Sequence, residues 1–441
     1  MMRIGESPEV SKSELDLYYV PPTQTAIEEG HYDDILPHSS YATADNIRFD
    51  IPGDSTHYAN LAETELYILG RIIVKGSPDL GIESAVKLGP VNNFLHSLFS
   101  QVNINISNQN VEISNSSYSI RSYLENLISF NKVEKPSILA GDLFEKDDFG
   151  EFDNFTIEAS TSGTTNKVNS GFLKRREKFL NARQVQLQGK LHCDLFTMNH
   201  LMVNSTSISI VLKKNEPKFY LMGEPESKNY VFVYDDCFLR IRRQVISPSV
   251  MSALSRLNEE FTFKYPIKRV VIKSFVIPET SVKVTLPKIC EGILPRRIVI
   301  GFLKTEAYDG SYAYSPFNFE NLGIKTMSLK VNSKSLPNTN GLKFDFANNL
   351  YLDGYKSISK LSKDLDITFA EYKSGYTLFS FDLNPDISSS THYSPLSDGV
   401  IDLEFTKEKA HSLSYTCICY LESDNIIQLN KHRQPSFDYN I

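Results

Sequence analysis

Apolar and polar residues alternate in short runs along most of this chain, which is the pattern of β-strands that bury one face. Asn46 to Ile51 alternates strictly, and a second run of strand length covers Glu65 to Lys75. Val102 to Ile106 and Val111 to Ile113 flank the turn residues Asn108 to Asn110. Asparagine tolerates the left-handed conformation of tight turns, so these three segments predict a β-hairpin.

Strand patterns continue through the rest of the chain at close intervals. They cover Gln184 to Leu195, Ser207 to Leu212, Tyr230 to Tyr234, Phe238 to Val245, Phe261 to Lys264, Ile267 to Ile277, Ser281 to Leu286, Arg297 to Leu303, Thr326 to Val331, Leu342 to Phe346, Thr377 to Leu383, Val400 to Phe405 and Ser414 to Leu421.

Helical spacing of apolar residues is confined to a few short segments. Pro90 to Ser100 predicts a short amphipathic helix, and a second helix begins at Asn115 or Ser116 with Ile120, Tyr123 and Leu127 on its buried face. Two further helices are predicted over Ser247 to Glu260 and Asp353 to Leu365.

Many strands, few helices and no β-α-β alternation predict an all-β protein built from antiparallel sandwiches. The 441 residues exceed what one core usually holds, so we expect two eight-stranded sandwiches side by side, a double jelly roll. The predicted parts are an extended N-terminal arm (1–45), a first jelly roll (46–225), a second jelly roll (226–430) and a C-terminal tail (431–441).

Residues 131–170 interrupt the strand pattern within the first jelly roll. The segment is polar and carries the acidic residues Asp142, Glu145, Asp147, Asp148, Glu151 and Asp153. These acids lack the ligand and glycine spacing of a calcium loop, so we interpret 131–170 as a long, solvated surface loop.

The net charge of −7 excludes the broad basic surface on which sequence-independent nucleic-acid binding depends. Two basic clusters, Lys174 to Arg176 and Arg240 to Arg243, are interpreted as solvated or interface charge. The N-terminal residues contain no apolar leader, and no stretch approaches eighteen apolar residues, so neither a secretory signal nor a membrane span is expected.

Five cysteines form no even disulfide framework and no CxxC pair, which favours a reducing compartment. Cys417 and Cys419 lie on one face of a predicted strand. Without a nearby third and fourth ligand they cannot complete a zinc site, so we interpret them as small buried apolar residues.

A search for catalytic chemistry finds no GxGxxG, GxxxxGK[ST], GxSxG or HExxH motif. The nine histidines are scattered, and a metal cluster could form only through space. His192, Cys193 and Asp194 are the most suggestive neighbours, yet adjacent strand residues point to opposite faces. His96 is expected to be a packed or capping residue. We therefore assign no catalytic, cofactor-binding or metal-binding residue and expect no enzyme.

One continuous segment, Leu88 to Val102 (LGPVNNFLHSLFSQV), closely resembles a motif of the major capsid proteins of Polinton (Maverick) elements and adintoviruses. The likeness extends over about residues 15–433. Further matching segments are Tyr19 to Thr25, Phe49 to Gly53, Ser122 to Leu127, Leu294 to Arg297, Gly310 to Tyr312, Ser315 to Phe319 and Tyr420 to Ile427.

This resemblance implies a double jelly-roll major capsid protein located in the virion capsid and assembled inside the host cell. It also implies homotrimeric, pseudo-hexagonal capsomers that tile an icosahedral shell. That shell would contact a penton or minor capsid protein and enclose double-stranded DNA without sequence-specific binding. No cofactor is implied.

Two other classes of function remain open from the residues alone. One is a carbohydrate- or receptor-binding β-sandwich protein that does not assemble. The other is an enzyme built on paired sandwiches, for which carboxylate pairs such as Asp235-Asp236 would have to serve; the absence of tryptophan disfavours a sugar-cleaving site.

Overall fold

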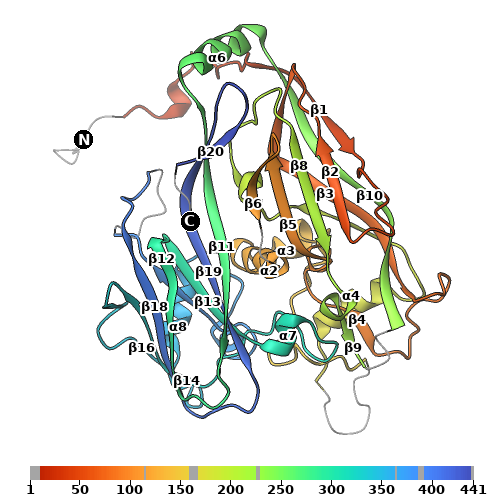
Figure 1. The fold of residues 1–441 in the computed structure, drawn as a ribbon, viewed down its shortest axis with the longest axis vertical. Coiled ribbons are helices and arrows are strands. Elements are labelled where there is room, and N and C mark those ends of the chain that lie inside the picture. Colours follow the sequence, from red (N-terminus) through yellow and green to blue (C-terminus); the bar gives the residue numbers. More distant parts are fainter. Residues whose placement is uncertain are drawn as a thin grey trace.

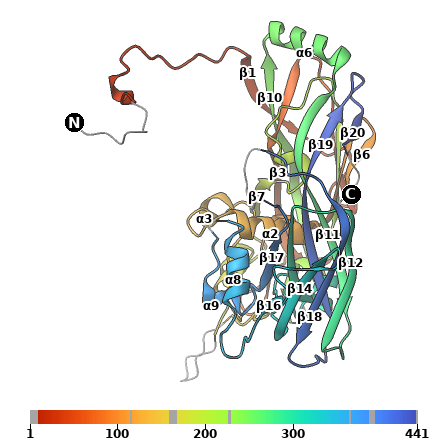
Figure 2. The same cartoon turned by 90° about the vertical axis from the view of Figure 1, so that its left-hand side faces the viewer.

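Two β-sandwiches stand side by side in the computed structural model, each made of two antiparallel sheets (Figure 1). The structure describes residues 10–113, 116–157, 167–224, 229–362, 365–385 and 392–438. Helix α2 (Tyr118–Ser129) lies between the sandwiches (Figure 1), and the described N-terminal residues leave the body as an arm (Figure 2).

The first sandwich contains two four-stranded sheets. One is ordered β1 (Ile27–Ile35), β10 (Tyr230–Ile246), β3 (His57–Val74) and β7 (Val185–Lys190). The other is ordered β2 (Asn46–Ile51), β8 (Ile208–Lys214), β5 (Phe99–Ile106) and β6 (Gln109–Ile113). A separate ribbon joins β4 (Leu88–Pro90) to β9 (Leu221–Gly223).

The second sandwich contains two five-stranded sheets. One is ordered β11 (Phe263–Ile277), β19 (Tyr415–Leu429), β13 (Arg297–Lys304) and β17 (Leu378–Asp382), with β20 (Pro435–Phe437) also on β19. The other is ordered β12 (Lys283–Ile293), β18 (Asp398–Lys407), β14 (Ile324–Val331) and β15 (Lys334–Leu336), with β16 (Leu342–Lys343) also on β14.

Both sandwiches have the same strand topology. When the eight main strands of each are numbered in chain order, leaving out β4, β9, β16 and β20, the sheet orders are 1-8-3-6 and 2-7-4-5 in both halves. The last strand thus returns beside the first, and consecutive strands alternate between the two sheets except for strands 4 and 5, which form a hairpin within one sheet. This is the jelly-roll arrangement, and it confirms the predicted double jelly roll.

Helices occupy the connections between strands rather than the sheets. They are η1 (Ser13–Leu15), α1 (Phe94–Ser97), α2 (Tyr118–Ser129), α3 (Lys135–Ile138), α4 (Ser170–Lys178), η2 (Asp194–Thr197), α5 (Pro217–Tyr220), α6 (Pro248–Glu260), α7 (Thr305–Asp309), α8 (Leu352–Ser359) and α9 (Phe369–Tyr372). Among the described residues, no helix has the length and apolar character needed to cross a membrane.

Local predictions agree closely with several elements. Strand β2 has the predicted bounds, and α6 lies within the predicted Ser247 to Glu260. The predicted hairpin is β5–β6, but its turn is made by Ser107 and Asn108, with φ of 48° and 65°, so that pairing starts at Gln109. The helix expected over Pro90 to Ser100 is shorter, because β5 already begins at Phe99.

The predicted boundary between the sandwiches at residue 226 is wrong. Strand β10 pairs with β3 from Tyr230 opposite Val74 to Val245 opposite His57, so it completes the first sandwich. The first sandwich therefore ends at Ile246, α6 connects the halves, and the second begins with β11. Alternation within β10 marks it as a strand but carries no information about which distant strand it pairs with.

The predicted arm is also too long at its C-terminal side. Residues 27–35 form β1, an edge strand whose partner is β10. Its sequence, IEEGHYDDI, is mostly polar because most of its side chains face solvent, and only Ile27, Asp33 and Ile35 are partly covered. The arm proper is thus confined, in the described chain, to residues 10–26.

Truncating a residue of β10 tests its place in the first core. Leu239 is fully buried in β10, whereas Leu257 in α6 is 57 % exposed. We expect Leu239→Ala to lower the free energy of unfolding by about 2–5 kcal/mol. Leu257→Ala should change it by less than about 0.5 kcal/mol. Urea titration followed by circular dichroism measures both, and equal losses would contradict the assignment of β10.

Candidate functional site: a buried junction between the sandwiches

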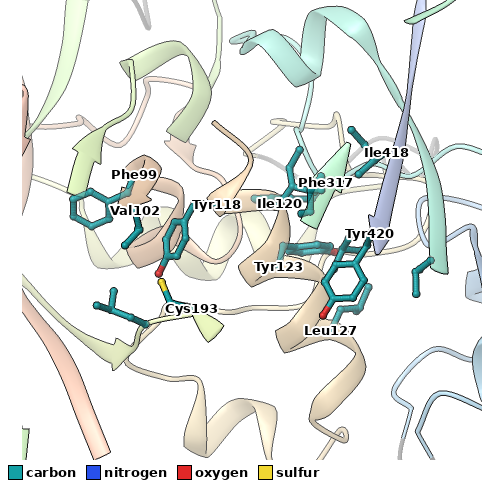
Figure 3. Close-up of a cluster of buried hydrophobic side chains, with 14 of the residues drawn as sticks. Phe99, Val102, Tyr118, Ile120, Tyr123, Leu127, Cys193, Phe317, Ile418 and Tyr420 are labelled. Atoms are coloured by element: carbon teal, nitrogen blue, oxygen red, sulfur yellow. The ribbon is translucent and has the colours of Figure 1, made fainter. Parts of the chain in front are cut away.

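Helix α2 is the element on which both sandwiches pack (Figure 3). The ring of Tyr123 stacks on Phe317 of the second half, with centroids 4.2 Å apart and planes 8° apart. On the opposite side of α2, Tyr118 packs among residues of the first half (Figure 3). The buried side chains around α2 therefore form one apolar cluster that crosses the boundary, including Phe99, Val102, Ile120, Leu127, Cys193, Ile418 and Tyr420.

A buried ion network is centred on Arg121 of α2. Its guanidinium donates to Glu112 of β6 at 2.7 Å, to Asp194 of η2 at 2.7 Å and to Glu125, one turn along α2, at 2.8 Å. The Arg121, Glu112 and Asp194 side chains are each no more than 7 % exposed. These bonds fix α2 to the first sandwich.

The second sandwich binds the same network from the opposite side. The backbone N–H of Val270 in β11 donates to Asp194 Oδ1 at 3.2 Å, and the hydroxyl of Tyr420 in β19 donates to Glu125 Oε1 at 3.3 Å. Two carboxylates held by Arg121 thus accept hydrogen bonds from both halves of the chain, so the network constrains the relative placement of the sandwiches.

Three carboxylates share one guanidinium, and their pKa values diverge as a result. Burial raises the pKa of Glu125, but the Arg121 charge and the hydrogen bond from His192 outweigh burial and hold it at about 2. Burial, reinforced by the neighbouring Asp194 charge, raises the pKa of Glu112 to about 8. Burial also raises the pKa of Asp194, so burial favours the neutral form at both Glu112 and Asp194.

Residues 131–157 form a second connection to the far sandwich. Lys146 Nζ donates to the Asp366 backbone oxygen at 2.7 Å and to Glu371 at 2.9 Å. Asp153 accepts from Lys304 Nζ at 3.0 Å and from the Ser315 backbone N–H at 2.9 Å. These contacts link the first half to α9, β13 and the chain that follows α7.

The prediction that 131–170 is a solvated surface loop is wrong for much of its described part, although residues 132–133, 136–138, 140 and 149–150 are exposed. Leu139, Leu143, Phe144 and Phe152 are at most 3 % exposed. Phe152 packs against Gly375 so closely that a Cβ there would lie 2.1 Å from its ring. Many of the charged side chains that make the segment polar are satisfied by ion pairs and hydrogen bonds within the protein rather than by water. Residues 158–166 lie outside the described part.

The basic cluster Lys174 to Arg176 belongs to this connection as well. Arg175 is 1 % exposed and donates to Asp147 at 2.7 Å and to the backbone oxygens of Pro90 and Glu145. Arg176 donates to three backbone oxygens of residues 83–86. In the other cluster, Arg240 and Arg243 pair with Asp34 and Asp33 of β1. Arg175 and Arg176 are thus buried links between segments, whereas Arg240 forms a partly exposed ion pair.

The residues singled out for chemistry are buried to different extents. Cys417 and Cys419 are both fully buried, as interpreted from the sequence, with sulfurs 3.8 Å apart. The other three cysteines are also free and buried. His96 is fully buried, as expected of a packed histidine. His192 binds Glu125 through Nδ1 at 2.7 Å, and its ring centroid lies 4.7 Å from that of His96.

Sequence reasoning did not find the Arg121 network. Its members come from β6, α2 and η2, so they are far apart along the chain, and α2 was predicted only as a helix with an apolar face. The one available signal was an arginine placed four residues before a glutamate on that helix, which is common on exposed helices. Neither residue type reveals burial by itself.

Comparison with known proteins finds no matching family model. An uncharacterised protein of Caenorhabditis elegans is 22 % identical over 438 residues, which is 95 % of this chain and 99 % of that protein.

Solved structures with the same arrangement are viral. A chain of the Sputnik virophage matches with a TM-score of 0.62 at 10 % identity and covers 99 % of this chain and 93 % of its own. The mavirus major capsid protein matches with a TM-score of 0.56 at 12 % identity, covering 99 % and 96 %. The faustovirus major capsid protein matches with a TM-score of 0.53 at 8 % identity, covering 93 % and 92 %. The fold is a double jelly roll.

Removing the Arg121 guanidinium tests the junction. We expect Arg121→Met to lower the free energy of unfolding by about 3–5 kcal/mol, because it leaves buried carboxylates uncompensated. The matched control is Arg240→Met, which breaks the more exposed pair with Asp34 and should cost less than about 1 kcal/mol. Chemical denaturation measures both; a small loss for Arg121→Met would show that the network does not stabilise the fold.

The raised pKa of Glu112 predicts a specific pH dependence. When the pKa of a carboxyl is higher in the folded than in the unfolded state, its contribution to the free energy of unfolding is fully present at pH values below the unfolded pKa. That contribution is lost as pH rises through the folded pKa. For Glu112 the window runs from about 4.5 to about 8. Glu112→Gln, which keeps the shape of the neutral acid, should therefore gain stability relative to the wild type between pH 5 and pH 9. A constant difference over that range would contradict the assignment.

Proposed function

We propose that this protein is the major capsid protein of a Polinton- or adintovirus-like double-stranded DNA virus or element. The observation that carries the proposal is the jelly-roll topology, which occurs twice in one chain. A buried junction joins the two jelly rolls. The full-length likeness to viral capsid chains supports it, as does the long motif from Leu88 to Val102.

Two sandwiches with the same order of eight main strands supply the geometry of a pseudo-hexagonal capsomer. Three copies arranged by threefold symmetry place six sandwiches in a ring, and a closed ring requires the same angle between sandwiches in every copy. The Arg121 network and the clamp formed by residues 131–157 restrict that angle within each chain. A rigid junction of this kind favours a shell subunit over a monomeric binding protein, because only the shell subunit requires a constant angle between its sandwiches.

The N-terminal arm provides a second support for self-assembly. It extends away from the body (Figure 2) and exposes five large apolar side chains, Leu15, Leu17, Tyr18, Tyr19 and Val20, which are each 65–97 % exposed. Such an exposed apolar run is unfavourable in a free monomer. We infer that a neighbouring copy of the chain covers the arm in the capsid.

The proposal also specifies partners and location. Capsomers would contact one another and a penton or minor capsid protein in the virion capsid, after assembly inside the host cell. The net charge of −7 fits a shell that encloses double-stranded DNA without coating it. The role is structural and involves no catalysis.

Solution mass tests the proposal directly. We expect multi-angle light scattering of the purified chain to give three times the 50.0 kDa chain mass, unchanged on dilution, because interfaces that close a ring are large. Electron microscopy of the same sample should show pseudo-hexagonal particles.

A chain without residues 1–24 is the matched control, since β1 starts only at Ile27. It should remain trimeric if side-by-side sandwich contacts make the capsomer. A full-length chain that stays monomeric at micromolar concentration and at raised salt would overturn the proposal and favour the carbohydrate- or receptor-binding alternative.

A further inference from the structure

Three side chains of the first sandwich converge on one point beside the junction. His96 comes from α1, Asp142 from the chain after α3, and His192 from the chain after β7. One potential ligand atom of each lies within 4.8 Å of the other two. No sequence motif links them, because they are separated by 46 and 50 residues along the chain.

Two of these atoms are buried without a hydrogen-bond partner. His96 Nε2 and Asp142 Oδ1 are 3.3 Å apart, but the pair is too poorly aligned for a hydrogen bond, and neither atom has another partner among the described residues. The His96 and Asp142 side chains are 0 % and 6 % exposed. A buried polar atom left unpaired costs roughly 1–3 kcal/mol, a cost that coordination of a cation by these two atoms would offset.

Surrounding hydrogen bonds orient both imidazoles. His96 Nδ1 lies 2.9 Å from the Tyr118 hydroxyl, and His192 Nδ1 lies 2.7 Å from Glu125 Oε2. This leaves Nε2 of each ring to bind a ligand. A metal-bound histidine usually has its second nitrogen held in this way by a carboxylate, hydroxyl or carbonyl, which fixes the ring and its tautomer.

One pair of ligand atoms in the cluster already has the spacing that a small divalent ion requires, and all three atoms lie within 4.8 Å of one another. Zinc bound at about 2.0–2.2 Å in tetrahedral geometry keeps its ligand atoms about 3.3 Å apart, which is the observed separation of His96 Nε2 and Asp142 Oδ1. Strand β7 makes room for the carboxylate at Gly189, where a Cβ would lie 1.7 Å from Asp142 Oδ1.

The site also has an entry route. Asp142, His192 and Gly189 line a cleft of about 710 Å³ between the two sandwiches, together with Glu125 and Tyr420. The His192 side chain is 14 % exposed, so it stands at the edge where the buried cluster meets the cleft. An ion held by three protein ligands would therefore have its fourth position open to a water molecule.

We propose that His96, Asp142 and His192 form a binding site for one divalent transition-metal ion, of which Zn²⁺ is the best match to two imidazoles and one carboxylate. The ion joins α1 and the end of β7 to the segment that clamps the second sandwich, and so stabilises the junction. This inference is independent of the capsid proposal, because it concerns a single chain.

Titration of the tag-free, full-length chain tests the site after treatment with a chelator and dialysis. We expect calorimetry with ZnCl₂ to give one Zn²⁺ per chain and the melting temperature to rise on binding. Co²⁺ should give the visible absorption of a four-coordinate nitrogen and oxygen site. His192→Gln should weaken Zn²⁺ binding at least about 100-fold, since loss of even an orienting partner costs 10–100-fold.

His200→Gln is the matched control, because His200 is exposed and its ring contacts only the Lys264 oxygen and the Tyr265 ring among the described residues. It should bind Zn²⁺ as the wild type does. Gly189→Ala keeps all three ligands but displaces Asp142, so it should also weaken binding. Absence of stoichiometric binding by the folded wild type would overturn the proposal, and so would equal affinities of His192→Gln and His200→Gln.

Discussion

The guanidinium of Arg121 lies between three carboxyl groups, of which those of Glu112 and Asp194 are buried and that of Glu125 is partly exposed. Asp194 and Glu125 also accept hydrogen bonds from the second sandwich. Buried charges are stable only when they are paired in good geometry, so the network tolerates little relative movement of its parts. An apolar junction alone could slide, because the hydrophobic effect has no direction. The stacking of Tyr123 on Phe317 supplies area, while the ion network supplies orientation.

Residues 131–157 extend the same principle over a wider contact. Their charged side chains pair with the second sandwich through Lys146 and Asp153. In the same segment Phe144 and Phe152 are buried, and Phe152 packs on Tyr376 of the second sandwich. Composition could not distinguish this arrangement from a solvated loop. An aspartate or lysine reads the same in the sequence whether its charge is paired within the protein or hydrated by water. The metal site proposed at Asp142 would anchor this segment at its first-sandwich end.

Repetition of one strand order in both halves places further demands on the connections. Each jelly roll returns its last strand beside its first, so β10 must reach back to β1 and β3 before the chain can leave for the second sandwich. Helix α6 then spans the gap without burying any of its own side chains. The connector therefore contributes little to either core, and the orientation of the halves depends on α2 and the clamp.

The sequence by itself determined the fold class and most local elements. Strict alternation located β2, turn-forming residues located the β5–β6 hairpin, and helical spacing located α2 and α6, because each depends on residues that are near neighbours. Only the tertiary structure decided that β10 closes the first sandwich and that the acidic segment is buried. It alone also brought Arg121 to Asp194 and His96 to Asp142 and His192. Those outcomes depend on contacts between distant segments, and the polarity of a residue does not reveal whether water or another part of the chain satisfies it.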